Sequence, residues 1–386
     1  MSWERVIGQE RVKKLLTQIL ISGKIPSAFL FDGPEGVGKD ALAIELAKTL
    51  NCEKSNVGPC EECGSCRQAN ALHHPNIRLL FPLPRGDNET KRDGPLDKLD
   101  ERTMRKIKEE LSLKAQDPYH RISVPKAQVI KISSIREVIR EDSLSLYQHG
   151  MRVIIVIQAE EVGTESANAL LKVLEEPSAR TVFILTTSKR SSLLPTIVSR
   201  CQTLRFDLLS ENEIEKALAS KYGIQQSDAK LKARLASGSY GRAIDLVGTD
   251  TLDIREEALD ILREVATNNY SQIASRAKKS LESKDLMRIE TLLKMVQIWL
   301  RDAAVVYSGL KTEVINQDKI EVLEKMVKSF DGTQLVSATN RVDAAISQLY
   351  SNVNLGILFV NLLMNLSGLL NGKKQVQSRR DTVGHV

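Results

Sequence analysis

The sequence predicts an α/β protein built on a parallel sheet, and three observations lead to this prediction. The stretch FLFDGPEGVGKD at 29–40 joins a short apolar run to a glycine-rich turn and a helix, which is the order of a phosphate-binding loop. The runs at 152–157 and 181–187 are almost continuously apolar, as is typical of strands buried on both faces of a parallel sheet. Helical patterns separate these runs, so the strands and helices alternate along the chain.

The composition limits the classes of protein that fit. The chain has 386 residues, and 42% of them are hydrophobic, which is enough for two or three folded domains. It carries 55 basic and 49 acidic residues, for a net charge of +6. This mild excess permits a place near nucleic acid without requiring one. Aromatic residues make up only 4% of the chain, which argues against a protein that stacks on single-stranded bases.

Local sequence patterns predict the elements that precede the apolar run at 152–157. Apolar residues at helical spacing predict a helix over 10–23, a short buried strand follows at 27–33, and the helix after the glycine-rich turn extends to Leu50. Residues 84–120 are dense in charge and turn formers. We expect them to form a partly disordered insertion with one surface helix over 100–113.

Two helices accompany the apolar runs at 152–157 and 181–187, and the chain beyond these runs is predicted to be helical. The two helices are expected at 134–144 and at 166–177, where Pro177 stops the second of them. No strand pattern is convincing from Leu208 onward. We therefore expect an α/β domain over 1–206, a small helical domain over 207–250, a helical bundle over 251–371 and a disordered tail over 372–386.

Neither end of the chain favours a membrane or export signal. The N-terminus has charges in its first turn and lacks the apolar core of a signal peptide. The apolar segment at 352–370 is a candidate membrane span, but Asn354, Asn361 and Asn365 interrupt it. A helix buried in a soluble bundle is the better interpretation, and we expect a cytoplasmic protein.

The glycine-rich turn departs from a working nucleotide site at one position. Gly33, Gly36, Gly38 and Lys39 match the residues that cradle nucleotide phosphates. The next residue should be Ser or Thr, whose hydroxyl binds Mg²⁺, but this chain has Asp40. A carboxylate there places a full negative charge beside a polyanion, which is repulsive in a partly dry site.

A second departure lies at the end of the strand at 152–157. A working site needs an Asp at the tip of a neighbouring strand to hold Mg²⁺, whereas this strand continues into Gln158. Glu160 and Glu161 follow two residues later, and we expect them to lie off the site. The two departures together predict that the loop does not hydrolyse ATP, while weak nucleotide binding through its backbone stays open.

Four of the five cysteines are close together in the sequence. Cys52, Cys60, Cys63 and Cys66 include two successive Cys-x-x-Cys steps, a spacing that suits tetrahedral Zn²⁺. Disulfides are the poorer interpretation in a reducing cytoplasm. His73 and His74 are nearby and could replace a ligand, although four thiolates make this unnecessary. We therefore predict a closed, structural zinc site, with Cys201 outside it and buried.

Several motifs together resemble the clamp-loader branch of the AAA+ ATPases. The resemblance covers residues 1–250 apart from the 84–120 insertion and continues more weakly through the C-terminal helices. Its most specific part is NALLK with LEEP, followed by SRC. The matching segments are 6–9, 33–39, the four cysteines, 168–172, 174–177, 185–187, 199–201 and 238–246.

This resemblance implies an assembly and a role. It implies an AAA+ core, a small helical lid and a helical collar that oligomerises, in a ring of five with gamma or tau motor subunits and a delta subunit. Such a ring loads a sliding clamp onto primed DNA, with no membrane involved. Because this chain departs from the motor subunits at Asp40 and Gln158, we expect it to be no enzyme on its own.

The resemblance also assigns a role to Arg200. In this family the Arg of Ser-Arg-Cys points towards ATP held by the neighbouring subunit. Arginine suits such a task because its planar, permanently charged fork stabilises charge on a transferring phosphoryl group. Two other interpretations stay open: an active gamma- or tau-like motor ATPase, and a free zinc protein that binds nucleic acid as a monomer.

Overall fold

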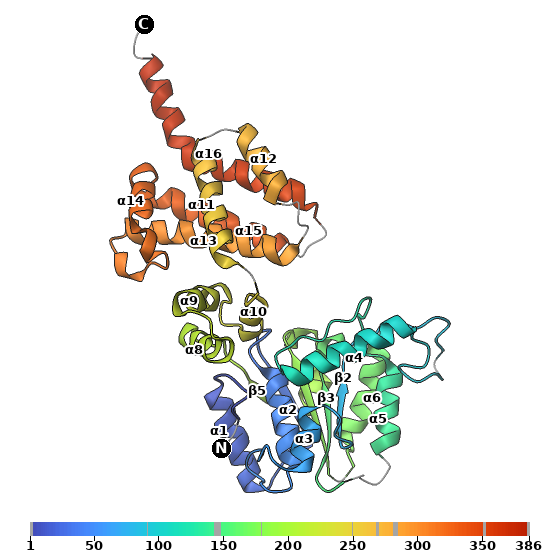
Figure 1. The fold of residues 1–386 in the computed structure, drawn as a ribbon. Coiled ribbons are helices and arrows are strands. Elements are labelled where there is room, and N and C mark those ends of the chain that lie inside the picture. The colour runs from blue at the N-terminus through green and yellow to red at the C-terminus, as the bar shows by residue number, and fades with distance from the viewer. Residues whose placement is uncertain are drawn as a thin grey trace. The chain divides into compact units, whose positions relative to one another are not determined.

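The computed structural model describes residues 3–90, 92–142, 148–178, 180–248, 250–267, 270–280, 285–349 and 353–383 (Figure 1). The chain forms two compact units, Met1–Val247 and Gly248–Val386. The finer division into a core, a lid, a collar and a tail stays a prediction. Across the described residues, no helix has an apolar stretch long enough to cross a bilayer.

The first unit is built on one parallel sheet, as the sequence predicted. Its strands are β1 (Ala28–Asp32), β2 (Ile77–Leu80), β3 (Arg152–Val156), β4 (Thr181–Thr187) and β5 (Gln202–Arg205). Their spatial order is β2-β3-β4-β1-β5, and all neighbours run parallel. The predicted α/β fold class, a parallel sheet with helices followed by a helical part of the chain, is confirmed.

Helices cover both faces of this sheet. The helices of the first unit are α1 (Glu10–Ser22), α2 (Lys39–Leu50), α3 (Gly64–Asn70), α4 (Glu101–Gln116), α5 (Ile132–Asp142), α6 (Thr164–Glu175), α7 (Pro195–Val198), α8 (Glu211–Tyr222), α9 (Gln226–Leu235) and α10 (Tyr240–Asp245), with 3₁₀ turns η1 (Ala159–Glu161) and η2 (Arg190–Ser192). Phe29 and Phe31 pack in the core shared with α1 and α2, whereas Leu30 packs in the core shared with α5 and α6. Successive side chains of a strand point to opposite faces of the sheet, and helices cover both faces. Side chains on both faces must therefore be apolar, which explains why the strands are continuously apolar.

The 84–120 insertion is more closely integrated than the sequence suggested. Its helix α4 begins after Asp100, whose side chain accepts a hydrogen bond from Thr103 N at 2.9 Å. The helix runs three residues beyond the predicted end, and its Ile107, Glu110 and Lys114 are buried. The expected surface helix therefore needs correction, because one face of α4 packs on the core of the first unit.

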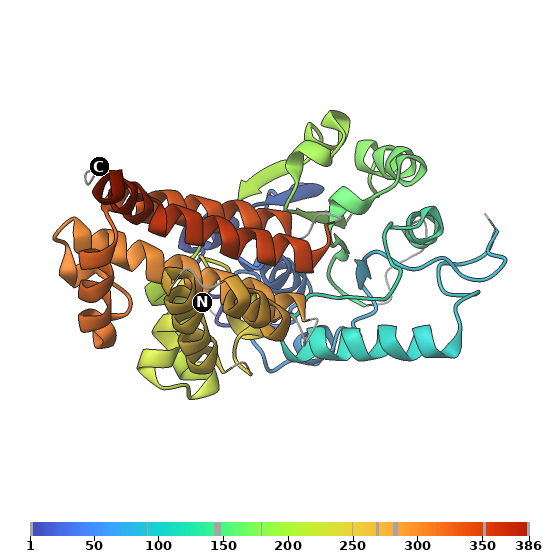
Figure 2. The ribbon, with the colours of Figure 1, turned by 90° about the horizontal axis from the view of Figure 1, so that it is seen from above.

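The second unit is a helical bundle (Figure 2). It contains α11 (Thr251–Thr267), α12 (Tyr270–Ser280), α13 (Leu286–Tyr307), α14 (Ile320–Ser329), α15 (Gly332–Gln348) and α16 (Leu355–Val383), with 3₁₀ turns η3 (Lys311–Glu313) and η4 (Gln317–Lys319). Trp299 is fully buried at its centre, where its indole N–H donates to the Arg255 carbonyl oxygen at 3.2 Å. Helix α16 continues to Val383 where a disordered tail over 372–386 was expected. Lys, Gln and Arg predominate there and are good helix formers, while 384–386 lie outside the described residues.

Candidate functional site: a filled phosphate loop and a four-cysteine cluster

The glycine-rich turn forms a phosphate loop between β1 and α2. Gly36 and Gly38 have positive φ angles of 73° and 103°, which glycine adopts without steric cost. The Lys39 ammonium is turned back into the loop, where it donates to the carbonyl oxygens of Gly33 at 2.7 Å and Pro34 at 2.5 Å. Burial holds the pKa of Lys39 below its usual value. The lysine that would bind terminal phosphates is thus satisfied by the loop's own backbone.

Asp40 is held by two partners. Its Oδ1 accepts a hydrogen bond from the Thr186 hydroxyl at 2.7 Å, and its Oδ2 lies 3.1 Å from the Lys114 ammonium. Burial alone would raise the pKa of Asp40, but the Lys114 charge and the Thr186 hydrogen bond outweigh it, so the pKa is lowered. Asp40 is therefore an ionised carboxylate paired with the Lys114 ammonium, and it stands at the position where a working loop has a metal-binding hydroxyl.

The loop is also covered from outside the sheet. The Gly241 amide donates to the Gly36 carbonyl oxygen at 2.9 Å. A Cβ atom on Gly36 would lie 2.1 Å from the Ser239 hydroxyl, and one on Gly38 would lie 2.8 Å from the Tyr119 hydroxyl. The start of α10 and the chain after α4 therefore press directly on the loop backbone, through which a nucleotide would have to be bound.

The end of strand β3 carries no carboxylate, as expected. Gln158 has a left-handed backbone (φ 56°) and begins the 3₁₀ turn η1. Glu160 lies closer to the loop than expected, since its charge acts on Lys39. Its Oε1 accepts hydrogen bonds from the Ser188 amide at 3.2 Å and hydroxyl at 2.8 Å. The Glu161 backbone accepts a hydrogen bond from the Ile130 amide and donates one to the Gln158 carbonyl oxygen, both at 2.8 Å.

Sequence reasoning missed Lys114, Thr186 and Tyr119 at this site. One signal was available for Lys114: Ile107, Glu110 and Lys114 follow one another on α4 in steps of three and four residues, which place all three on one helix face. A lysine on an apolar face requires a buried anionic partner. No comparable local pattern marks Tyr119, which lies in the turn after α4.

The four cysteines are brought together as predicted. The Sγ atoms of Cys52, Cys60, Cys63 and Cys66 all lie within 4.8 Å of one another, and those of Cys60 and Cys66 are 3.9 Å apart. Tetrahedral zinc with Zn–S bonds of about 2.3 Å requires sulfur atoms roughly 3.8 Å apart. The donor set and spacing therefore fit Zn²⁺.

Backbone groups around the cluster favour thiolates. The Sγ atoms of Cys60 and Cys63 accept hydrogen bonds from the amides of Cys63 at 3.4 Å and Cys66 at 3.3 Å. The backbone hydrogen bond from Glu62 lowers the pKa of Cys60 to about 6, while burial raises that of Cys66.

Neither nearby histidine replaces a cysteine ligand. Both ring nitrogens of His74 are already hydrogen-bonded: its Nδ1 accepts from the Asn76 amide at 3.1 Å, and its Nε2 bonds to the Ser65 hydroxyl at 2.9 Å. His73 is exposed and outside the cluster.

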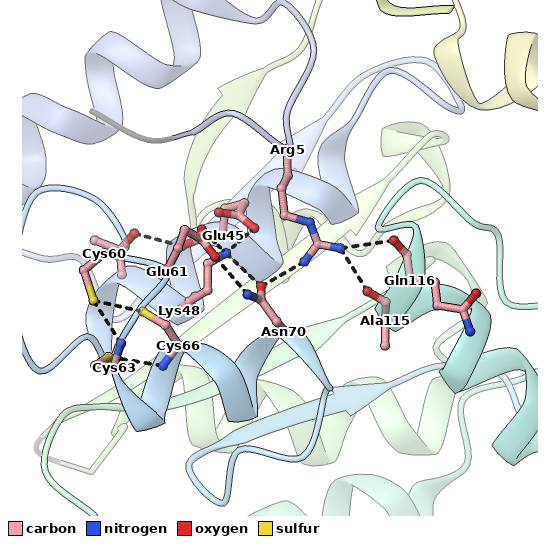
Figure 3. A network of polar contacts seen from close by, with 11 residues as sticks. Arg5, Glu45, Lys48, Cys60, Glu61, Cys63, Cys66, Asn70, Ala115 and Gln116 are labelled. Atoms are coloured by element: carbon pink, nitrogen blue, oxygen red, sulfur yellow. Dashed lines mark hydrogen bonds and ion pairs between the residues drawn. The ribbon is translucent and has the colours of Figure 1, made fainter. Parts of the chain in front are cut away.

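A buried polar network ties the cysteine loop to the rest of the unit (Figure 3). The Lys48 ammonium of α2 contacts the Glu45 carboxylate at 2.8 Å, the Glu61 carboxylate at 2.6 Å and the Asn70 side-chain oxygen at 2.9 Å. Arg5 donates to Asn70 at 2.8 Å and to the carbonyl oxygen of Ala115 at 2.9 Å. The cysteine loop, the helix of the phosphate loop and the end of α4 are therefore joined by hydrogen bonds.

Arg200 lies just after α7 at the surface of the first unit. Its guanidinium forms an ion pair with Glu175 at 2.5 Å and donates to the Thr196 carbonyl oxygen at 3.0 Å. About a third of its side chain is exposed, so a docking partner could reach it. Cys201 beside it is only partly buried, and burial raises the pKa of its thiol to about 11.

Family models match most of the chain. A model described as DNA polymerase III, delta subunit, matches residues 8–210, and one described as DNA polymerase III, delta subunit, C terminal, matches residues 249–368.

Among solved structures, a protein from Thermotoga maritima related to the DNA polymerase III gamma subunit is 16% identical to this chain. It covers 93% of this chain and 99% of its own, at a TM-score of 0.42.

The curated relatives are subunits of the same polymerase. DNA polymerase III subunit delta′ of Bacillus subtilis is 27% identical over 95% of this chain and 98% of its own. Subunit tau of the same organism is 28% identical, but the match covers 76% of this chain and only 46% of tau. The first model alone spans more than half of the chain, and the second accounts for most of the remainder. The chain belongs to the DNA polymerase III delta subunit family.

Proposed function

We propose that this chain is a delta-prime-type subunit of the DNA polymerase III clamp loader that does not hydrolyse ATP at its own loop. The observation that carries the proposal is the engagement of the Asp40 carboxylate by Lys114 and Thr186. Mg²⁺ and phosphates would have to displace a buried ammonium there, while Lys39 would have to leave two carbonyl oxygens. Breaking each of these contacts costs free energy, and this cost is absent from a loop in which the corresponding groups have no such partners.

The catalytic contribution we propose is made in trans by Arg200. The side chain is partly exposed and already binds a carboxylate, Glu175. A planar guanidinium that recognises one anion can exchange it for the phosphates of ATP on a neighbouring subunit. Gamma or tau subunits would hold that ATP, and a delta subunit would complete the ring that places the sliding clamp on primed DNA.

The four cysteines would hold one structural Zn²⁺ within this role. A Cys₄ site is closed, with no position left for water chemistry. Its connection to α2 through Glu61 and Lys48 indicates that the metal stabilises the fold around the loop.

The proposal is tested by ATP turnover, first with the chain alone and then with its gamma or tau partner present. The isolated chain should give no turnover above a Lys39→Ala control. Asp40→Thr should not restore it, because Gln158 still leaves the strand end without a metal ligand. Turnover by the isolated wild-type chain, lost in Lys39→Ala, would instead establish an active motor.

A further inference from the structure

A cationic cleft lies on the 84–120 insertion, away from the phosphate loop and the cysteines. It has a volume of about 920 Å³ and is formed by three segments: the chain after β2, the residues that lead into α4 together with its first half, and the turn at 125–126. Its basic lining residues are Arg85, Lys98, Arg102, Arg105, Lys106 and Lys126.

Most of these cations form no ion pair with a described residue, although Lys98 and Arg102 lie near enough to Asp93 and Asp100 to help lower the pKa of those carboxyls. Lys106 forms ion pairs with Glu109 and Glu110. Among the described residues, the other five form no ion pair within 4 Å, although ion pairs are frequent elsewhere in the first unit. The cleft is also lined by the carboxylates of Asp87, Asp100 and Glu109, which are fewer than its six cations. The cleft therefore carries a net positive charge that the protein does not neutralise.

The segments that carry these cations are held in place. Gly86 packs so closely on the other arm of the insertion that a Cβ atom there would lie 2.4 Å from the Lys98 carbonyl oxygen. The Lys131 ammonium contacts the Glu89 carboxylate at 2.7 Å and the Pro95 carbonyl oxygen at 3.0 Å. These contacts hold together the backbone segments from which the cations extend.

We propose that this cleft binds the phosphodiester backbone of nucleic acid. Arg102 and Arg105 are one helical turn apart on α4, so their α-carbons are separated by about 4.5 Å along the helix axis. Two cations this close together can face the dense charge of a nucleic-acid strand, which carries roughly one phosphate per 3.4 Å along its axis. The inference deepens the proposed function and rests on it for the identity of the DNA, but it depends on neither Arg200 nor Lys39.

The lining favours a nucleic-acid backbone over an acidic protein segment. Its only apolar residues are Pro84, Leu99 and Pro125, whereas protein interfaces depend on aromatic and aliphatic anchors in pockets. The absence of aromatic residues from this lining also argues against base stacking. We expect contacts to phosphates without base readout, and hence binding that is independent of sequence.

The test is fluorescence anisotropy with the full-length chain, using a labelled primed duplex and a second duplex of unrelated sequence at low salt. The variant is a triple replacement of Arg85, Arg102 and Arg105 by Ala. It should bind both duplexes roughly tenfold or more weakly than wild type, and the slope of log K against log salt should fall in magnitude by about 2–3. The matched control replaces Lys14, Lys24 and Lys216, three exposed cations outside the cleft, and should bind as wild type does.

Three results would overturn the inference: no binding by wild type at low salt, equal binding by the triple variant, or equal losses in the triple variant and the control. Poly-glutamate is measured in parallel. If the triple variant loses poly-glutamate but keeps DNA, the cleft binds an acidic protein and the inference is wrong. Zinc content and unfolding temperature show that each variant is folded. Because Arg200→Ala should leave this binding unchanged, failure here is distinguishable from failure of the proposed function.

Discussion

The Asp40 carboxylate lies 3.1 Å from the Lys114 ammonium, an ion pair between residues 74 positions apart. It joins the first turn of the phosphate-loop helix to the last turn of α4. Lys114 is only 1% exposed, so it depends on this partner and on the His120 carbonyl oxygen at 2.8 Å. The residue that stands where a working loop has its metal-binding hydroxyl therefore also holds the insertion on the core.

Asp40→Asn should destabilise the first unit by about 2–4 kcal/mol, because it leaves a buried ammonium without its counter-charge. The measurement is denaturant unfolding followed by a probe in the first unit. Thr186→Val, which removes one hydrogen bond to the same carboxylate but leaves both charges of the ion pair in place, is the control and should cost about 1.5 kcal/mol. Equal, small effects of the two variants would show that the ion pair contributes little.

The same pair predicts non-additivity. Lys114→Met should be destabilising alone because it leaves Asp40 without its cation, but in the Asp40→Asn background most of this cost should disappear. Removing both charges of a buried pair is far less harmful than removing one. A double-mutant cycle measures the coupling between the two side chains, and additive effects would contradict the interaction.

The stability difference between wild type and Asp40→Asn should depend on pH. The pKa of Asp40 is lowered from its ordinary value of 3.8 in the folded state. A lowered pKa means that the unfolded state binds the proton first, so the contribution is complete above about pH 5 and is lost as pH falls through the folded pKa. The difference should be constant between about pH 5 and 8 and shrink below about pH 4; a difference that grew on acidification would have the wrong sign.

Gly36→Ala should disrupt the contact between the loop and α10. The control is Gly23→Ala: both glycines have φ near 70°, but a Cβ on Gly23 meets nothing within 4 Å, whereas one on Gly36 meets the Ser239 hydroxyl at 2.1 Å. The Gly36 variant should lose about 1–3 kcal/mol more. Its Gly241 amide, which donates to Gly36, should also exchange hydrogen faster. Equal costs at the two glycines would mean that α10 does not press on the loop.

Metal analysis of freshly purified protein should find one Zn²⁺ per chain. Cys60→Ser should release it and lower the unfolding temperature of the first unit, since structural zinc contributes folding free energy directly. Cys201→Ser is the matched control, because this thiol lies outside the cluster, and it should keep the metal. Zinc-free wild-type protein would refute the assignment.

The sheet and the cysteine cluster were predictable because their signals are local. β3 and β4 are fully buried runs, and the four cysteines lie within fifteen residues. Strand β5 was missed because Leu204 is its only buried residue, which leaves an edge strand with no apolar pattern.

The state of the phosphate loop was only half predictable. Asp40 and Gln158 showed that the loop lacks a metal-binding hydroxyl and a carboxylate at the neighbouring strand end. They did not show which residues contact the loop. Lys114, Ser239 and Gly241 reach the loop from distant parts of the chain, and tertiary contacts of this kind leave no periodic trace in a single sequence. The insertion was misjudged for the same reason, since a charged helix can still bury ion-paired charges.

The proposed function has this chain contribute to ATP hydrolysis through Arg200, at a nucleotide held by a neighbouring subunit, and not through its own loop. A finger is worth roughly 10³–10⁵ in rate at the site that it faces. Arg200→Ala should therefore silence one motor site and leave the sites served by other subunits active. Folding, zinc content and ring assembly should be unchanged, because the side chain is partly exposed and bound to Glu175 at the surface. Arg200→Lys should not rescue, since a point charge lacks the fork geometry.

The most direct measurement is DNA-stimulated ATP turnover and clamp loading by the complete assembly carrying Arg200→Ala, beside one carrying Lys39→Ala. We expect the Arg200→Ala assembly to lose a fraction of its turnover and most clamp loading, whereas the Lys39→Ala assembly should keep the wild-type catalytic rate per folded assembly. Wild-type rates with Arg200→Ala, or a matching catalytic loss with a folded Lys39→Ala chain, would contradict the proposed function.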